Sequence, residues 1–533
     1  MDPQTRSTST RSRIVAVIDI GTSAIRMAIA EILPDGAIRH LESLTQALSL
    51  GHQSFTAGEI SRGMIEECIA VLRAYRRKLE EYGITRSEDI RIVATSAVRE
   101  AVNRINFVDR VFVATGLSVE TLDAAEIHRI TYRGVQPLLK AQPALFKSRS
   151  MIVEVGGGST ELLILEEGNV DYSHAFRLGS LRLQQTLASY HVPRSRAKKL
   201  LEAEIHSHLE PFEEMLTAHP SENMVAMGSD MRFACEEILD DPVKKDRLVK
   251  LKLDRLAEFV DFLFSQSEES IVNRFHLTYA EAETVGPALL ANLKIAEAIH
   301  VDRIYVCSVN LRDGLVRDLS EGGAWSEDFR KQILRATWEL ARKYDVDEDH
   351  AKTVAELCRL LFQQLRKYHE LEERYETVLC VAAALHEIGA YINTSSMHKH
   401  SMYLIMNSSL FGLTQEDLNL IGMVARYHRR AMPKSSHQAY ASMDRQRRVV
   451  VSKLAAILRI AIALDASRNQ RIRQLECSQV RDRIILTVPQ TEDLSMEQIA
   501  VRRNRTFFEA IFGLDILLRT QSRPLVSEPS SQL

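Results

Sequence analysis

The stretch Ile14–Ile32, IVAVIDIGTSAIRMAIAEI, reads as an apolar strand, a turn that carries glycine and hydroxyl residues, and a second apolar strand. Residues 151–167, MIVEVGGGSTELLILEE, repeat this pattern around a run of three glycines. Because a supersecondary unit that occurs twice in one chain is typical of a duplicated domain, the two stretches predict a duplicated α/β architecture.

The rest of the chain changes character near residue 323. Before it, helical patterns such as residues 60–82 alternate with short apolar strands, for example IRIVA, MVAM and IYVCSV. After it, amphipathic helical patterns dominate to about Asp465, and a short segment with strand and helix patterns follows. We expect a tail at 1–13, lobes at 14–140 and 141–322, a helical domain at 323–466, a small α+β module at 467–520 and a tail at 521–533, both tails being disordered.

The composition of the 533 residues is that of a globular protein, with 45% hydrophobic and 26% charged residues and a formal net charge of −3. A chain this close to neutrality has no overall field that would draw it to nucleic acid. Its six cysteines have no regular spacing, and no apolar run is long enough to cross a membrane or to resemble a secretory signal. We therefore expect reduced thiols, no integral membrane contact and a cytoplasmic location.

The two turns predict a cleft that binds phosphate. Glycine allows the backbone to approach a phosphate closely, and exposed N–H groups and hydroxyls donate hydrogen bonds to its oxygens. An ordinary hairpin turn is the alternative for one such sequence, but two of them at the ends of matching strands favour the cleft. The candidate phosphate-binding residues are Gly21, Thr22, Ser23, Gly157, Gly158, Ser159 and Thr160.

Acidic residues flank both turns. Asp19 and Glu154 end apolar strands, where a carboxylate is costly without a partner, and Glu161 follows the second turn. Their oxygens are hard ligands that suit Mg²⁺, which bridges phosphate oxygens in many enzymes. The sequence therefore predicts a magnesium site made by Asp19, Glu154 and Glu161.

Several stretches resemble the exopolyphosphatase/guanosine pentaphosphate phosphohydrolase (Ppx/GppA) family. These are VIDIGTSAIRM, ATSAVREAVN, VEVGGGSTELLI, LGSLRL, VAMGS and VNLRDGL in the first half, and ALHEIGAYIN, HKHSMYLIMNS and ARYHRR in the second. The resemblance implies a duplicated actin-like, sugar-kinase-like α/β fold followed by an all-α domain similar to HD-type phosphohydrolases. The duplication read from the turns agrees with it.

The resemblance also implies an activity. It is the removal of terminal orthophosphate from polyphosphate or from a guanosine pentaphosphate-like nucleotide, with Mg²⁺ and an attacking water. Phosphoryl transfer of this kind relies mostly on positioning and charge stabilisation. By motif position Arg99 would pair with phosphate oxygens, Gly228 would lie beside the phosphate, and Glu154 would be both a metal ligand and a catalytic residue.

The chain departs from the family pattern at the catalytic base. Alignment on Gly134 places Ile127 where the family has its catalytic glutamate, and Glu126 lies next to it. Glu126 or Asp123 would then replace the base. The alternatives are a sensor that binds polyphosphate or nucleotide without rapid turnover, and an enzyme with an altered substrate.

The helical half holds a second candidate site. HD-type phosphohydrolases gather histidines and acids around one or two metals, and the corresponding residues here are His350, His386, Glu387, His428 and Asp465. A transition metal bound there would make this half a metal phosphohydrolase and the first cleft regulatory. The competing interpretation is that these histidines are structural or contact phosphate.

A basic stretch runs from Arg426 to Arg448. It is either a solvated surface or a track that guides a polyanion towards the cleft. Aromatic residues make up only 6% of the chain, which disfavours base stacking on single strands, so we expect no DNA partner. A homodimer rests on family analogy alone.

Overall fold

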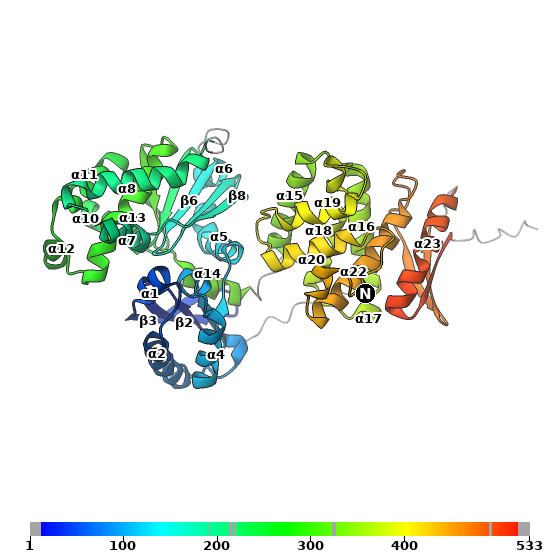
Figure 1. Cartoon of the computed structure of the whole chain (residues 1–533), viewed down its shortest axis with the longest axis horizontal. Helices are drawn as coiled ribbons and strands as arrows, with labels where there is room; N and C mark the ends of the chain where they lie inside the picture. The colour runs from blue at the N-terminus through cyan, green and yellow to red at the C-terminus, as the bar shows by residue number, and fades with distance from the viewer. Residues whose placement is uncertain are drawn as a thin grey trace, which may run out of the picture. The chain divides into compact units, whose positions relative to one another are not determined.

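The structure is a computed structural model that describes residues 12–190, 192–212, 216, 220–321, 327–489 and 493–520. The chain divides into two compact units, residues 1–326 and 327–533, which run from blue to green and from yellow-green to red in Figure 1. Most of the two tails that we expect to be disordered, and the boundary expected at Gly322, lie outside the described residues. The other domain boundaries stay predictions.

A five-stranded sheet forms the centre of the first lobe, with the strand order β3-β2-β1-β4-β5. The strands are β1 (Arg13–Ile20), β2 (Ala24–Ile32), β3 (Ile38–Ala47), β4 (Ile90–Ala94) and β5 (Glu120–Thr121). Strands β1 to β3 are antiparallel, whereas β4 is parallel to β1 and β5 is parallel to β4. The helices are α1 (Leu50–Ala57), α2 (Arg62–Glu81), α3 (Ser96–Arg99) and α4 (Arg104–Thr115). The helical periodicity at 60–82 thus forms α2, which buries its apolar face in the core of this lobe.

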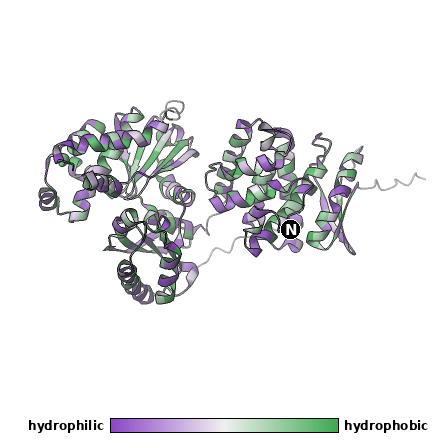
Figure 2. Ribbon diagram, viewed as in Figure 1, coloured by the Kyte–Doolittle hydropathy of each residue, from purple (hydrophilic) through white to green (hydrophobic). Residues whose placement is uncertain are grey.

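The second lobe has a six-stranded sheet with the order β10-β11-β9-β6-β7-β8. Its strands are β6 (Ser150–Val155), β7 (Thr160–Glu166), β8 (Asn169–Phe176), β9 (Asn223–Met227), β10 (Val249–Lys252) and β11 (Arg303–Val306). Its helices are α6 (Pro143–Lys147), α7 (Ser180–Tyr190), α8 (Arg194–Leu209), α10 (Ser229–Leu239), α11 (Leu253–Ser265), α12 (Glu268–Phe275) and α13 (Tyr279–Ala298). In Figure 2 the strands of this sheet are mainly green, and the helices around it carry purple residues as well.

The two sheets share one topology. The order β8-β7-β6-β9-β11 corresponds strand for strand to β3-β2-β1-β4-β5, and β10 adds an antiparallel edge. The N-terminal unit is therefore the expected duplicated actin-like α/β fold. Each copy also has a third strand, β3 or β8, that the sequence pattern did not predict, because these edge strands carry few buried residues.

Two helices connect the lobes, α5 (Ala124–Lys140) and α14 (Leu311–Ser320). Helix α14 follows the last strand of the second sheet and packs against α5 and β1. Its residue Asp318 accepts hydrogen bonds at 2.6 Å from Arg91, Arg129 and Arg133. These buried charges fix the end of the second lobe to the first.

The C-terminal unit is a helical domain followed by a small strand-bearing module. The helices are α15 (Glu327–Lys343), α16 (Glu348–Gln364), α17 (Arg366–His369), α18 (Arg374–Leu385), α19 (Met397–Met406), α20 (Gln415–Arg426), α21 (Gln438–Ala441) and α22 (Arg445–Leu464). The module consists of β12 (Glu476–Val480), β13 (Arg483–Val488), α23 (Ser495–Phe512) and β14 (Asp515–Thr520), with the sheet order β12-β13-β14. Among the described residues of both units, no helix is long and apolar enough to cross a bilayer.

Candidate active site

The two glycine turns meet between the lobes of the N-terminal unit. In each turn the N–H of the first glycine donates to the carbonyl three residues later, at 3.0 Å for Gly21 and 2.8 Å for Gly156. A methyl group added to Gly157 would lie 2.3 Å from Oγ1 of Thr22. The two turns are therefore in contact.

The second turn also packs against the first lobe beyond the turn residues. A methyl group added to Gly158 would lie 2.5 Å from Oγ of Ser96, at the start of α3, and 2.4 Å from the ring of Phe55. Arg182 donates from Nε to the carbonyl of Gly158 at 2.7 Å and pairs through Nη2 with Glu100 at 2.7 Å. These contacts hold the turn against the loop that carries the ATSAVREAVN stretch.

Asp19 and Glu154 occupy equivalent positions beside the two turns, at the ends of β1 and β6. Asp19 is 8% exposed, and its Oδ1 is buried without a hydrogen-bond partner. Burial raises the pKa of Asp19 above its usual value. The pKa of Glu154 is raised to about 7, mainly by burial and to a smaller extent by the negative charges of Glu161 and Asp19. The site therefore concentrates acidic groups whose negative charge the protein does not fully compensate.

Three arginines from distant parts of the chain surround these acids: Arg26 on β2, Arg232 on α10 and Arg312 at the start of α14. Nη1 of Arg312 lies 3.5 Å from Oδ2 of Asp19, and Nη1 of Arg232 is buried without a partner. Arg312 and Arg26 oppose the rise in the pKa of Asp19, and Arg232 and Arg312 oppose that of Glu154. Guanidinium groups beside glycine turns suit phosphate oxygens.

Sequence reasoning did not single out these three arginines. Arg26 lies in the VIDIGTSAIRM stretch and Arg312 in the VNLRDGL stretch, and these were the available signals, whereas no pattern connects Arg232 to the turns. Met231, on the same helix as Arg232, is fully buried in the core of the second lobe.

Glu161 is engaged by protein groups on both carboxylate oxygens. Oε1 accepts a hydrogen bond from Oγ of Ser159 at 2.8 Å, and Oε2 lies 2.7 Å from Nε2 of His128. Both His128 and Glu161 are buried. His128 was missed by sequence reasoning, because no motif links it to a strand 33 residues later.

The expected magnesium ligands do not gather as one triad. Among the residues that the structure describes, Asp19, Glu154 and Glu161 are not a group whose oxygens all lie within 4.8 Å of one another. Glu161 faces His128 and Ser159 instead. The free Oδ1 of Asp19 and the uncompensated charge of Glu154 do fit a hard cation, since oxygen donors and excess negative charge are what Mg²⁺ requires.

The remaining phosphate candidates lie at different depths. Thr22 is partly exposed and Ser23 is exposed. Thr160 is fully buried and its hydroxyl donates to the carbonyl of Leu178 at 2.6 Å, so that it supports the turn from inside. Gly228 lies between β9 and α10 with φ at 108°, a conformation that side chains rarely adopt.

Arg99 lies at the end of α3 and is partly exposed. Its Nη1 donates to the carbonyl of Leu122 at 3.1 Å, which anchors one side of the guanidinium at the entry to α5.

The expected replacement bases, Glu126 and Asp123, lie at the start of α5. Glu126 has a pKa raised to about 7 by burial and by the charges of Glu120 and Asp123, and Arg91 opposes that rise. Asp123 caps α5 by accepting a hydrogen bond from the N–H of Glu126 at 2.9 Å. Ile127 is buried in an apolar cluster of the first lobe. Neither Glu126 nor Asp123 is among the charges that act on Asp19 or Glu154.

The helical domain brings part of the second candidate site together. Ligand atoms of His350, His386 and Glu387 all lie within 4.8 Å of one another. Burial lowers the pKa of His386 to about 4, its Nδ1 bonds the carbonyl of Ala383 at 2.7 Å, and its Nε2 is buried without a partner. A neutral imidazole with a free nitrogen that lies beside a carboxylate is a suitable metal ligand.

Two residues expected in this group have other roles. Asp465 bonds Nδ1 of His350 through Oδ2 at 2.7 Å and accepts the N–H of Gln470 on Oδ1 at 2.9 Å, so it orients His350. The ring of His428 lies 5.1 Å from that of His386, outside the group of three.

Comparison with known proteins follows the division into two units. The profile of the Ppx/GppA phosphatase family matches residues 16–321, and that of Ppx/GppA phosphatase, domain III, matches residues 334–501. An exopolyphosphatase from Cytophaga hutchinsonii is similar in structure, with 20% identity over 58% of this chain and 99% of that chain and a TM-score of 0.53. A Ppx/GppA family member from Aquifex aeolicus has 24% identity over 58% of this chain and 97% of its own, with a TM-score of 0.49.

Proposed function

The chain belongs to the Ppx/GppA phosphatase family, and from this premise we propose that it releases terminal orthophosphate from inorganic polyphosphate or from a guanosine pentaphosphate-like nucleotide. The observation that carries the proposal is the contact of the two glycine turns beside Asp19, Glu154 and three arginines. Such a site offers donors and positive charge to a terminal phosphate, and carboxylates to a cation and a water.

In this proposal the terminal phosphate lies against the turns, with Thr22, Ser23 and the second turn donating hydrogen bonds. Arg232 and Arg312 neutralise its oxygens, and Arg99 contacts the phosphate chain. Asp19 is the residue that would hold Mg²⁺, which supplies charge neutralisation on the phosphate oxygens when it is bound.

Glu154 acts as the base. The water oxygen forms a bond to the terminal phosphorus, Glu154 accepts the proton from that water, and the bond from phosphorus to the bridging oxygen breaks. The products are orthophosphate and a chain shorter by one phosphate. This assignment replaces Glu126, whose charged neighbours are Glu120, Asp123 and Arg91.

His128 is a positioning residue in this scheme. It fixes Glu161, which in turn accepts from Ser159 and so fixes the second turn. Loss of the imidazole would leave a buried carboxylate oxygen without its partner and would release the turn.

The test compares two matched variants, Glu154→Gln and Glu126→Gln. Orthophosphate release is measured with polyphosphate and with guanosine pentaphosphate, in the presence of Mg²⁺. We expect Glu154→Gln to lower kcat by about 10²–10⁴-fold and Glu126→Gln to change it by less than about threefold. The opposite ranking would return the base to Glu126.

A sensor that binds without turnover is the competing function. It predicts tight binding of polyphosphate by calorimetry and no orthophosphate release with any divalent cation. Measurable multiple turnover by the wild-type chain would exclude it.

A second candidate function is a metal phosphohydrolase in the helical domain, favoured by His350, His386 and Glu387 together with the free Nε2 of His386. We expect elemental analysis of the purified chain to find about one transition metal per chain, and His386→Ala to remove it. Metal-free protein with full activity would contradict this role.

The six cysteines are unpaired in the structure, which supports a reducing compartment such as the cytoplasm.

A further inference from the structure

A cavity of about 310 Å³ lies in the C-terminal unit beside α22 and α23. It is separate from the histidine group, because none of its lining residues belongs to that group. Its lining comprises Tyr440, Arg445, Arg448, Val449, Ser452, Lys453, Ala510 and Ile511. The volume is at the lower end of the range found for small-molecule sites.

Positive charge dominates this lining. It contains Arg445, Arg448 and Lys453 and no acidic residue. In the part of the chain that the structure describes, none of these three cations has a carboxylate within salt-bridge distance. Lys453 donates to the carbonyl of His369 at 2.7 Å, which leaves its charge uncompensated, and Nε of Arg448 is buried without a partner. Uncompensated cations that converge on a cavity favour an anionic ligand.

The nearest acid on the same helix does not fill this role. Asp444 caps α22 and pairs with Arg447, which is not part of the lining. Arg447 in turn reaches Glu416 at 2.5 Å. The negative charge at this end of α22 is therefore directed to Arg447 and away from the cavity.

An apolar wall and two hydroxyls complete the cavity. Val449, Ala510 and Ile511 supply the wall, and Val449 is 44% exposed. Oη of Tyr440 lies 3.1 Å from Oγ of Ser452, which also donates to the carbonyl of Arg448 at 2.9 Å. The hydroxyls are thereby fixed beside the cations, with the tyrosine ring as a flat apolar surface.

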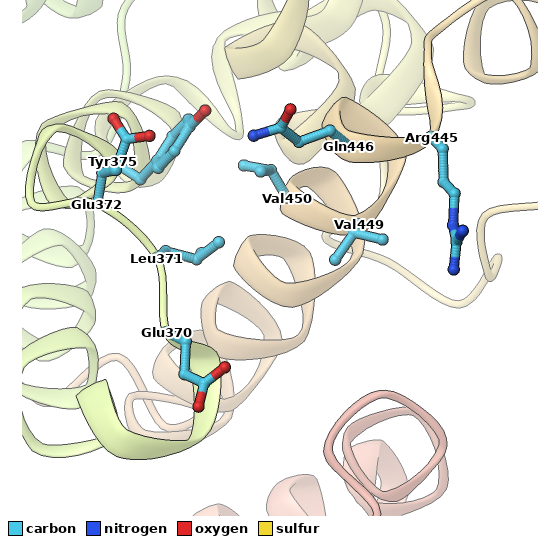
Figure 3. A pocket seen from close by; sticks show the side chains of 8 residues that line it. All are labelled: Glu370, Leu371, Glu372, Tyr375, Arg445, Gln446, Val449 and Val450. Atoms are coloured by element: carbon cyan, nitrogen blue, oxygen red, sulfur yellow. The ribbon is translucent and has the colours of Figure 1, made fainter.

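A neighbouring cavity of about 390 Å³ differs from this one because its lining contains both acidic and basic residues. This cavity shares Arg445 and Val449 but also contains Glu370 and Glu372 (Figure 3). In Figure 3 the guanidinium of Arg445 lies at the far end from both glutamates and points away from them. Only the side next to α23 therefore combines cations with an apolar wall and no acid.

We propose that the cavity between α22 and α23 binds an organic phosphate of the size of a nucleoside monophosphate. The three cations match the two negative charges of a phosphate monoester, and the apolar wall with the ring of Tyr440 matches a base or another flat apolar group. A bare phosphate chain would use the cations but would leave this wall exposed to water. The site is distinct from the glycine turns and adds ligand binding to the helical unit.

The experiment uses the full chain with adenosine 5′-monophosphate, inorganic phosphate and tripolyphosphate as probes. Hydrogen exchange measured by mass spectrometry locates binding, and calorimetry gives the affinity. The variant Ala510→Glu places a negative charge in the lining without removing a contact, and Gln498→Glu adds the same charge elsewhere on α23 as a matched control. Arg445→Ala removes one cation at an exposed position.

We expect adenosine monophosphate to protect peptides that cover residues 440–453 and 507–512. Ala510→Glu should weaken this binding by tenfold or more, Arg445→Ala by about three- to tenfold, and Gln498→Glu by less than twofold. The protection separates this site from any binding at the turns of the other unit. The proposal is overturned if these peptides stay unprotected, if Ala510→Glu binds as the wild type does, or if inorganic phosphate or tripolyphosphate protects them as strongly.

Discussion

The side chains of three consecutive residues near the start of α5 lie in three different environments. Glu126 faces Glu120, Asp123 and Arg91, Ile127 is buried among apolar side chains, and His128 reaches Glu161 in the other lobe. Consecutive helical residues are about 100° apart around the axis, so a shift of one position sends a side chain to another environment. A glutamate adjacent to the family's catalytic position therefore cannot simply take over its role.

Glu126 is expected to affect stability rather than catalysis. Its pKa of about 7 means that the folded protein keeps a proton which the unfolded chain loses near pH 4.5, so stability falls as pH rises between these values. Glu126→Gln removes this fall in stability at high pH. Allowing for the partial exposure of Glu126, the variant should raise the free energy of unfolding by about 1–2 kcal/mol at pH 8. The two proteins should be equally stable near pH 4. Urea unfolding at both pH values, with the exposed Glu59→Gln as control, measures this. Equal stability at pH 8 would disprove it.

At the scale of elements, the strand–turn–strand units determine where the site is. Each unit ends its first strand with an acid and passes directly into a glycine turn, and the register pairs Asp19 with Arg26 and Glu154 with Glu161. The sequence predicted both units and their turns because these are local patterns. It did not predict β3 or β8, since these edge strands contain few fully buried residues.

The contact of the second turn with α1 and α3 of the first lobe can be tested by adding one methyl group. Gly158→Ala would bring Cβ within 2.5 Å of Oγ of Ser96 and 2.4 Å of Phe55, so the turn must move away from the first lobe. We expect kcat/KM for orthophosphate release to fall by at least about tenfold. Gly63→Ala is the matched control, because its Cβ would meet nothing within 4 Å inside α2, and it should leave activity unchanged and raise stability slightly. An active Gly158→Ala enzyme would show that the second turn need not pack against Ser96 and Phe55.

At the scale of the whole molecule, each unit has its own means of fixing distant segments. In the N-terminal unit this is Asp318, which is 2% exposed and binds arginines from β4 and α5. In the C-terminal unit it is Asp465, which joins the end of α22 to His350 of α16. Both are buried acids whose partners lie far away in the sequence.

Asp318→Asn should destabilise the N-terminal unit strongly. It removes the carboxylate that accepts four hydrogen bonds from Arg91, Arg129 and Arg133, and removal of one partner from a buried ionic group costs roughly 3–5 kcal/mol. Denaturant unfolding should show this loss, and Asp302→Asn, at a surface ion pair of the same unit, should cost less than about 1 kcal/mol. A loss below 1 kcal/mol for Asp318→Asn would mean that the arginines find other partners.

The sequence alone determined the duplicated α/β unit, the glycine turns with their flanking acids, and the helical second half. Each of these features follows from a pattern of residues that are close together in the chain. Only the tertiary structure decided that Arg232 and Arg312 lie beside Asp19 and Glu154, that His128 holds Glu161, and that Glu126 has Glu120, Asp123 and Arg91 as charged neighbours. Residues far apart in the chain become neighbours through strand order and helix packing, and the direction of a side chain depends on the rotation of its helix. Local residue patterns encode neither the order of strands in a sheet nor the rotation of a helix about its axis.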